Sequence, residues 1–283
     1  MNATKLYNQL EQDFRLSICK DDWSEIRADE FITPQYLKRY MGLVTDNSEN
    51  ITYAYTAVFP SPAVIAKIIK DNRREAMLFV HHPVDWDITK PPVFTNIPVD
   101  DMKELQKRKI SMYNLHTPLD AVGEYSTGVT LAHALGIRIT GEFDEYHGVN
   151  VGVLGTVNCT TIPQLKAQFE EVVGHEVALY PYGESAIKDG KVALVAGGGN
   201  EAAVYPYLRE HGINTFITGI ASMRDSYPPS VEAHNSAKEN GVNILAGSHY
   251  STEKFACMKM VEYFAKLGIP GEFVPDKPCM EDM

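Results

Sequence analysis

The sequence predicts an α/β fold in which helices flank mixed, mostly parallel sheets. Short apolar runs alternate with helix-like stretches along most of the chain, which is the pattern of consecutive strand–helix units. Three of the apolar runs are followed closely by a histidine with a carboxylate nearby. The 283 residues suffice for one large or two ordinary domains with substantial cores.

The expected helices rest on apolar residues at helical spacing and on capping residues. Leu6, Leu10 and Phe14 recur one turn apart, so we expect helix from the start of the chain to about residue 30. Ser61 followed by Pro62 marks another helix start. Further helices are expected at 63–69, 98–108, 128–135, 162–173, 201–210, 230–239 and 251–267, and strands at 76–80, 112–115, 149–154, 176–180, 191–195, 215–218 and 242–245.

Two α/β lobes are expected from this pattern. The strand, helix and strand between 149 and 180 look like a separate module, and a polar turn region follows them. We therefore expect a metal-binding lobe made of residues 1–144 and 190–283, with a smaller lobe, 145–189, inserted into it.

Composition excludes several functional classes. The net charge of −11 and the pI near 5.3 disfavour a nucleic-acid partner, which usually requires a basic stripe. A small anionic substrate is compatible, because bound cations reverse the local field. The four cysteines form no CxxC pair, so we expect reduced structural thiols. No apolar run spans a bilayer and the N-terminus lacks a signal-peptide layout, so we expect a cytoplasmic protein without a membrane anchor.

Two of the candidate clusters follow neighbouring strands. His81 and His82 close the run 76–80, and His116 follows the run 112–115, with Asp120 four residues beyond it in a loop shaped by Pro118. Ligands gather at the carboxyl ends of strands in open α/β sheets. Adjacent residues of an extended chain point to opposite sides, so the two adjacent histidines could serve one ion each. The Asp120 carboxylate could bridge two cations.

The third cluster lies near the C-terminus. His249 precedes a helix that Ser251 can cap, and Glu253 lies in its first turn. The i, i+4 spacing lets His249 and Glu253 reach one point, and the helix dipole favours the negative charge.

Imidazoles and carboxylates without thiolates suit two divalent ions of Zn, Fe, Mn, Co or Ni, and residue type does not choose among these metals. Each cluster alone has an ordinary structural explanation, and their combination favours a metal site. Two other features stay open. Gly197-Gly198-Gly199 is either a tight turn or a phosphate-binding loop, and His234 is either a neighbour of the site or a packing histidine.

The motifs, in this order, resemble the NIF3-like family of dinuclear-metal proteins, whose members are named GTP cyclohydrolase 1 type 2 homologs. They span about residues 60–255 and are Val80-His81-His82-Pro83, Leu115-His116-Thr117-Pro118-Leu119-Asp120, Phe216-Ile217-Thr218-Gly219 and Gly247-Ser248-His249-Tyr250-Ser251-Thr252-Glu253. The resemblance implies the metal ligands His81, His82, Asp120, His249 and Glu253, with both carboxylates as bridges. It also implies that His116 is a substrate-facing or outer group, and that the protein forms a toroidal homohexamer.

Two functions are expected from these residues. The first is a metal-dependent hydrolase in which a water shared by two ions attacks a small nucleotide-like substrate, and His116 transfers a proton or orients the substrate. The resemblance names GTP, and phosphoesters, other nucleotides or cyclic amides fit the same chemistry. The alternative is a non-enzymatic oligomeric metal-binding scaffold that binds regulatory partners.

Overall fold

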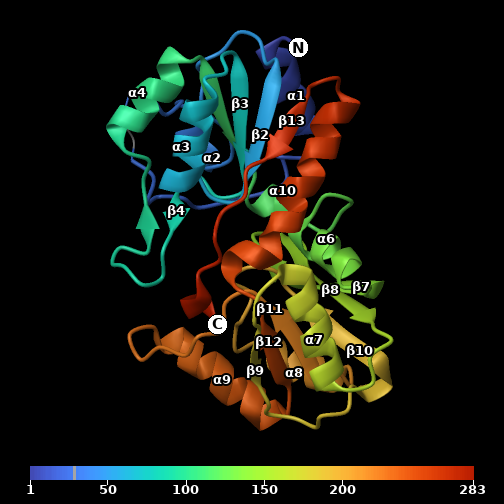
Figure 1. Ribbon diagram of the computed structural model, residues 1–283. Coiled ribbons are helices and arrows are strands. Elements are labelled where there is room, and N and C mark those ends of the chain that lie inside the picture. The colour runs from blue at the N-terminus through green and yellow to red at the C-terminus, as the bar shows by residue number, and fades with distance from the viewer. Residues whose placement is uncertain (28–29) are drawn as a thin grey trace. The chain divides into compact units, whose positions relative to one another are not determined.

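A computed structural model describes residues 1–27 and 30–283 and divides the chain into two compact units (Figure 1). Each unit has its own sheet and its own helices. Helix α10 (His249–Lys266) belongs to both units, which divide it after Phe255. The first unit comprises Met1–Ala121, His147–Val149 and Ala256–Lys277, and the second comprises Val122–Tyr146, Asn150–Phe255 and Pro278–Met283.

The first unit is built on a five-stranded sheet of order β1-β6-β3-β2-β13. Strands β6, β3, β2 and β13 run parallel to their neighbours, and only the edge strand β1 is antiparallel. A two-stranded hairpin, β4 and β5, follows the His-His motif. The strands are β1 (Gly42–Thr45), β2 (Tyr53–Ala57), β3 (Ala76–Val80), β4 (Asp85–Trp86), β5 (Phe94–Thr95), β6 (Ile110–Asn114) and β13 (Gly271–Phe273), and the helices are α1 (Ala3–Asp13), α2 (Tyr36–Arg39), α3 (Pro62–Asp71), α4 (Val99–Lys107) and α5 (Thr117–Asp120).

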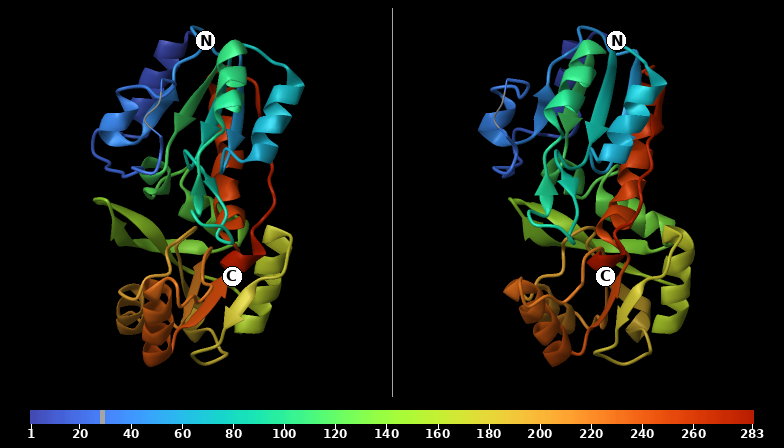
Figure 2. Two further views of the ribbon diagram at one scale, coloured as in Figure 1. Left: turned by 90° about the vertical axis from the view of Figure 1, so that its left-hand side faces the viewer. Right: turned by 60° about the vertical axis from the view of Figure 1, so that its left-hand side comes forward.

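Helices cover both faces of this sheet. Ala76, Leu78 and Val80 alternate along β3 and pack into a buried cluster with apolar residues of α3 and α4. On the opposite face, the Phe79 ring contacts that of Phe264 in α10, with centroids 5.8 Å apart. Figure 2 turns α3 and α4 toward the viewer. The first unit is therefore a three-layer α/β/α structure.

The second unit has a six-stranded mixed sheet of order β7-β8-β10-β11-β12-β9. Strands β10, β11 and β12 are mutually parallel, whereas β8 and β9 pair antiparallel with β10 and β12. The strands are β7 (Arg138–Tyr146), β8 (Val149–Thr156), β9 (Ala178–Tyr180), β10 (Lys191–Leu194), β11 (Thr215–Thr218) and β12 (Asn243–Ala246), and the other elements are α6 (Thr127–Ala134), α7 (Ile162–Val173), α8 (Val204–Glu210), α9 (Pro228–Asn240) and the 3₁₀ turns η1 (Lys188–Gly190) and η2 (Met280–Asp282).

The second unit also buries both faces of its sheet. Apolar residues of α6 and α7, among them Leu131 and Phe169, form one cluster with Ile217 and Leu245 of the sheet. Phe216 points to the other face, where its ring meets Tyr205 of α8. These layers confirm the predicted α/β class with mixed sheets.

Three local expectations differ from the structure. The first helix ends at Asp13 rather than near residue 30, because Arg15 takes a positive φ of 48° and the chain turns; residues 28 and 29 lie outside the described residues. Asp120 lies in the single helical turn α5 rather than in a loop. Strands β1, β4, β5, β7 and β13 were not expected. In β7 the burial pattern is mostly exposed or intermediate, so its sequence gives little apolar alternation.

The division into units also differs from the expected lobes. The first unit's N-terminal segment ends at Ala121 rather than at 144, and the second unit continues to Phe255 rather than to 189. The physical reason is strand pairing, because β10, β11 and β12 lie in one sheet with β8 and β9.

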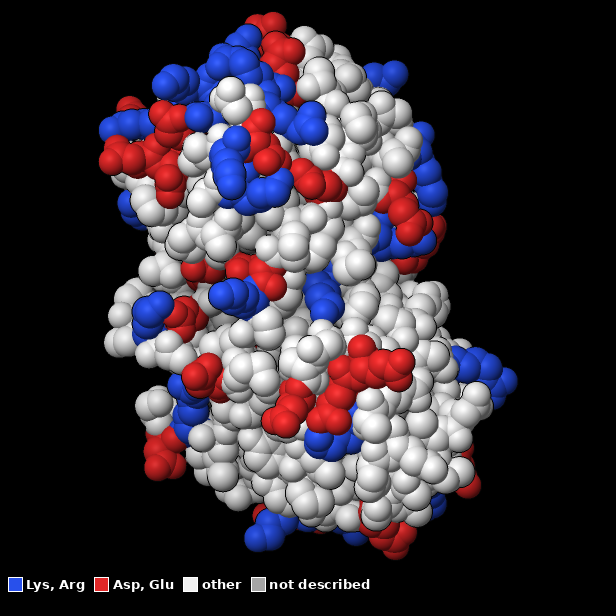
Figure 3. Space-filling model, viewed as in Figure 1, with Lys and Arg blue, Asp and Glu red and all other residues white. Residues whose placement is uncertain are grey.

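Charges on the surface are interspersed rather than gathered by sign. Figure 3 shows Lys and Arg next to Asp and Glu over the face that it draws. In the basic stretch 103–109, Nζ of Lys103 lies 3.4 Å from Oδ1 of Asp100, and Nζ of Lys107 lies 3.6 Å from Oε1 of Glu104. Among the described helices, none combines the length and apolar character needed to cross a membrane.

The burial of Asp85 in β4 can be tested through the pH dependence of the protein's stability. Burial raises the pKa of its carboxyl to about 6, from 3.8. A raised pKa stabilises the folded protein below pH 3.8, and this stability is lost as the pH rises through about 6. We therefore expect Asp85→Asn to raise the free energy of unfolding by roughly 1 kcal/mol near pH 8, after allowance for solvent screening, and to give no gain near pH 4.

Asp87, two residues away, is the matched control for this measurement. Hydrogen bonds from Lys90 and Thr89 hold the pKa of its carboxyl below the ordinary value. Asp87→Asn should therefore lower stability near pH 8, which is the opposite sign. Thermal unfolding at both pH values checks the pair, and an equal effect of both substitutions would contradict the assignment.

Candidate metal centre

The parallel pairing of β3 and β6 places His81. Val80 lies opposite Asn114, so the chain leaves both strands at the same edge of the sheet. The Asn114 side-chain amide donates to the His81 carbonyl, and its own oxygen accepts from the Tyr36 hydroxyl at 3.1 Å. His81 is fully buried. The His81 N–H donates to the Ala57 carbonyl at 3.2 Å, so hydrogen bonds hold both the N–H and the carbonyl of this residue.

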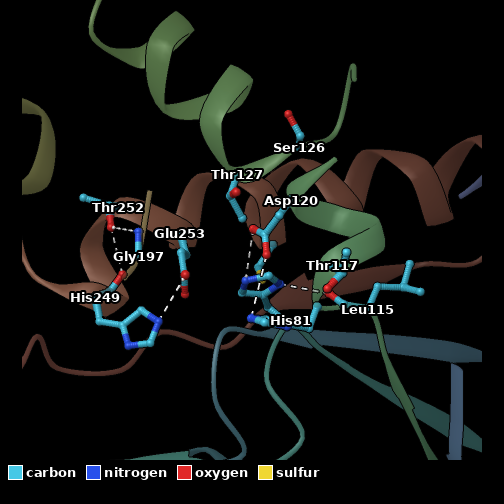
Figure 4. Close-up of polar contacts among 12 residues, drawn as sticks. His81, Leu115, Thr117, Asp120, Ser126, Thr127, Gly197, His249, Thr252 and Glu253 are labelled. Atoms are coloured by element: carbon cyan, nitrogen blue, oxygen red, sulfur yellow. Dashed lines mark hydrogen bonds and ion pairs between the residues drawn. The ribbon is translucent and has the colours of Figure 1, made fainter. Parts of the chain in front are cut away.

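The hydrogen bond of the His81 ring determines which nitrogen can bind a cation. Nδ1 lies 2.9 Å from the Leu115 carbonyl, which can only accept, so Nδ1 carries the hydrogen. In the neutral ring Nε2 then presents its lone pair, and it lies 3.4 Å from Oδ1 of Asp120. Figure 4 shows the ring between Leu115 and the Asp120 carboxylate. This is the usual arrangement of a metal-binding histidine with its outer hydrogen bond.

His82 is buried beside His81, and the two rings converge. Its ring stacks on Phe59, with centroids 4.7 Å apart, and meets Trp23 edge to face at 5.4 Å. The centroids of His81 and His82 are 4.4 Å apart. One nitrogen from each of His81, His82 and His116 lies within 4.8 Å of the others. The expectation that the adjacent histidines point to opposite sides does not hold, because both residues follow the end of β3.

His116 is held by a carboxylate that the sequence analysis missed. Both oxygens of Asp21 lie 3.1 Å from Nδ1 of His116, and Oδ2 also accepts the Thr117 N–H at 3.1 Å. Burial favours the neutral forms of both groups, but their mutual attraction and hydrogen bonds outweigh it. The pKa of Asp21 is therefore lowered and the pKa of His116 is raised. Nε2 of His116 lies 3.8 Å from Oδ2 of Asp120.

In the second unit, α10 begins at His249 rather than at Ser251. Ser248 takes a positive φ of 65°, and its hydroxyl accepts the Ser251 N–H at 3.2 Å, so Ser248 rather than Ser251 caps the helix. The buried carboxylate of Asp282 accepts the His249 N–H at 2.9 Å. His249 thus lies inside the helix, and its spacing to Glu253 is helical.

The side chains of His249 and Glu253 face each other, with Nε2 3.1 Å from Oε1, and both residues are buried (Figure 4). Gly197, after β10, passes directly over this pair. A Cβ on Gly197 would lie 2.1 Å from Oε1 of Glu253 and 3.3 Å from Cδ2 of His249. The Gly197 N–H donates to the Thr252 hydroxyl at 3.0 Å. This glycine is therefore required for close approach to Glu253 as well as for its positive φ of 66°.

Each unit thus presents an imidazole and a carboxylate that fit one divalent ion. Two ligands at about 2.1 Å from a metal lie about 3.4 Å apart at a tetrahedral angle and about 3.0 Å apart at a right angle. The His81–Asp120 and His249–Glu253 separations are 3.4 and 3.1 Å. In the first unit, the lone pair on Nε2 of His81 also faces a carboxylate oxygen, and a cation would satisfy both.

His234, left open by the sequence, is buried in packing contacts. Its Nε2 donates to the Ala221 carbonyl at 2.6 Å, and its Nδ1 accepts from the Tyr182 hydroxyl at 2.9 Å. Both ring nitrogens therefore already have protein partners.

Comparison with known proteins bears on both the fold and the site. A family model described as Duf34/NIF3 (NGG1p interacting factor 3) matches residues 31–274. A relative from Archaeoglobus fulgidus, named GTP cyclohydrolase 1 type 2 homolog, is 30% identical over 90% of this chain and 94% of its own. A relative of the same name from Pyrococcus horikoshii is 28% identical over 84% of this chain and 89% of its own.

Solved structures share the fold. The protein ybgI superposes with a TM-score of 0.76 at 21% identity, covering 99% of this chain and all of the other. Reduced HcgD from Methanocaldococcus jannaschii gives a TM-score of 0.69 at 21% identity and covers 98% of each chain.

Gly197→Ala tests the close approach to Glu253. The new methyl group would displace the carboxylate and force a strained backbone, so we expect a loss of stability of about 1–2 kcal/mol. We also expect a fall of at least about tenfold in the affinity for Zn²⁺ or Co²⁺, the scale on which misoriented ligands act. Gly198→Ala is the matched control, because its nearest neighbour is Cδ1 of Ile220 at 3.9 Å. Metal titration and thermal unfolding of both variants check this, and equal affinities would contradict it.

Proposed function

The chain belongs to the Duf34/NIF3 family, and on this premise we propose that it is a dinuclear metal-dependent hydrolase acting on a small nucleotide-like substrate. The observation that supports it best is the orientation of His81. Its Nδ1 is committed to the Leu115 carbonyl and its Nε2 faces the Asp120 carboxylate, as in a metal-binding histidine.

The proposed ligands are those that the resemblance implies. His81, His82 and Asp120 come from the first unit, and His249 and Glu253 come from the second. All but Asp120 are buried, and Asp120 is largely so. An all-nitrogen and oxygen donor set favours Zn, Fe, Mn, Co or Ni over Ca or Mg.

Two bound ions would supply Lewis acidity and lower the pKa of a bound water toward neutrality. The side chains of this chain supply the rest. Asp120 offers one oxygen on the His81 side and the other on the His116 side. His116, anchored by Asp21 and facing Asp120, is the residue that we propose for proton transfer or substrate orientation.

The substrate proposal rests on relatives and on charge. The curated relatives carry the name GTP cyclohydrolase 1 type 2 homolog, which makes nucleotides the first compounds to test. The net charge of −11 does not oppose a small anion at the site, because bound cations reverse the field there. A homohexamer in the cytoplasm, as the resemblance and the sequence predict, completes the proposal, and light scattering tests the assembly.

Metal content tests the proposed centre. We expect about two equivalents of transition metal per chain in untagged wild-type protein, and fewer in Asp120→Asn and Glu253→Gln, because each substitution removes a charged ligand. Glu262→Gln on the same helix is the control, because Glu262 is exposed and pairs with Lys259. Elemental analysis gives the result. Two full equivalents in Asp120→Asn would refute the bridging role.

A second measurement separates the hydrolase from a metal-stabilised scaffold. An enzyme requires an exchangeable position, so phosphate or a hydroxamate should change the visible spectrum of the Co²⁺ form, and nucleotide hydrolysis should follow metal loading. A closed centre that ignores both ligands and hydrolyses none of the nucleotides would favour the scaffold that binds regulatory partners.

A further inference from the structure

Asp21 is a buried residue whose carboxylate contacts the imidazole of His116. Its side chain is only 1% exposed, and both of its oxygens lie 3.1 Å from Nδ1 of His116. Oδ2 also accepts the Thr117 N–H at 3.1 Å. Burying a carboxylate is costly unless its oxygens are hydrogen-bonded, and these contacts supply that compensation.

The segment that carries Asp21 is anchored against the histidines and lies ahead of the residues that the family model matches, 31–274. Leu16 and Trp23 are buried on either side of Asp21. The Trp23 ring meets His116 edge to face, with centroids 4.9 Å apart, and meets His82 in the same way at 5.4 Å. Asp21 is therefore held in place by packing as well as by its own hydrogen bonds.

Two imidazoles are arranged alike around Asp120. Nδ1 of His81 donates to the Leu115 carbonyl, and Nε2 of the same ring lies 3.4 Å from Oδ1 of Asp120. Nδ1 of His116 donates to the Asp21 carboxylate, and Nε2 of the same ring lies 3.8 Å from Oδ2 of Asp120. A carboxylate only accepts, so Asp21 requires the hydrogen of the neutral His116 ring to lie on Nδ1.

We propose that Asp21 is the positioning residue of His116. It fixes the ring and its tautomer, so that Nε2 is presented, without a hydrogen, to the ligand or substrate group bound beside Asp120. This deepens the proposed function, in which His116 acts at the site, but the tautomer is a property of the protein itself. It can therefore be measured without any turnover.

Asp21→Asn should move the hydrogen of the neutral ring. Oδ2 of Asp21 accepts the Thr117 N–H, and Oδ1 accepts the Asp22 N–H at 3.0 Å, whereas the new side chain has one amide oxygen. That oxygen would keep the Thr117 N–H, because Thr117 is buried, whereas Asp22 is exposed and its N–H can turn to water. The amide NH₂ would then face Nδ1 of His116 and donate to it. The ring must in consequence carry its hydrogen on Nε2, which turns the presented atom from an acceptor into a donor.

Long-range ¹H–¹⁵N correlation spectra of metal-free protein with ¹⁵N-labelled histidine measure this directly. His116→Gln assigns the signals, and the pH is set high enough for the ring to be neutral. We expect wild type to carry the hydrogen on Nδ1 and Asp21→Asn to carry it on Nε2. Asp22→Asn is the matched control and should match wild type, because Asp22 is exposed and its carboxylate accepts the Ser24 N–H.

Three results would overturn the proposal: a wild-type ring with its hydrogen on Nε2, an unchanged tautomer in Asp21→Asn, or the same change in Asp22→Asn. The wild-type spectrum decides the first point even where the variant fails to fold. Once a hydrolysed substrate is known, Asp21→Asn should lower kcat about 10²–10⁴-fold, the usual share of a proton-transferring group. Failure to find any substrate would count against the hydrolase and would leave the tautomer result unaffected.

Discussion

The parallel register between β3 and β6 is the constraint on which the first half of the site depends. Val80 opposite Asn114 brings the chain out of both strands at the same edge, and the Leu115 N–H then donates to the Val80 carbonyl at 3.1 Å. The Leu115 carbonyl in turn orients the His81 ring. A main-chain atom sets the tautomer of this histidine, so the identity of the side chain at position 115 matters little to it. The strand register therefore also sets the orientation of the His81 ring.

The second unit reaches a similar result by a different route. Gly197 follows β10 and the first turn of α10 follows β12, two strands of one parallel set, so both lie at the carboxyl edge of that set. The Thr252 hydroxyl ties them together, because it accepts from the Gly197 N–H and lies 2.9 Å from the Ser248 carbonyl, to which it donates. Here the absence of a side chain at Gly197 makes the space that the Glu253 carboxylate occupies.

Local patterns predicted the strand ends and the helices well, because both depend on residues close together in the chain. The strand before His81 ends at Val80 as expected, and the strand before His116 ends at Asn114, one residue earlier than expected. Burial on both faces gives each of them a continuous apolar run. Asp21 could not be found in this way. It contacts a histidine 95 residues away, and it lies in a segment that was expected to be helix but that follows the end of α1 without regular structure. The close approach of Gly197 to Glu253 could not be predicted either, because the glycine run 197–199 fits any tight turn.

Charge links the carboxylates and the histidines of the first unit. Asp21 and Asp120 are carboxylates in largely buried surroundings, and the neutral rings of His81 and His116 turn lone pairs toward Asp120. Such an arrangement is unfavourable unless positive charge is supplied. The Asp21 carboxylate favours a proton on His116, because its attraction outweighs the opposing effect of burial and raises the pKa of that ring. A divalent cation held by His81 and Asp120, as proposed, would also supply positive charge to the Asp120 carboxylate. The charges of the first unit therefore favour a cation beside Asp120, which is the position proposed for the metal.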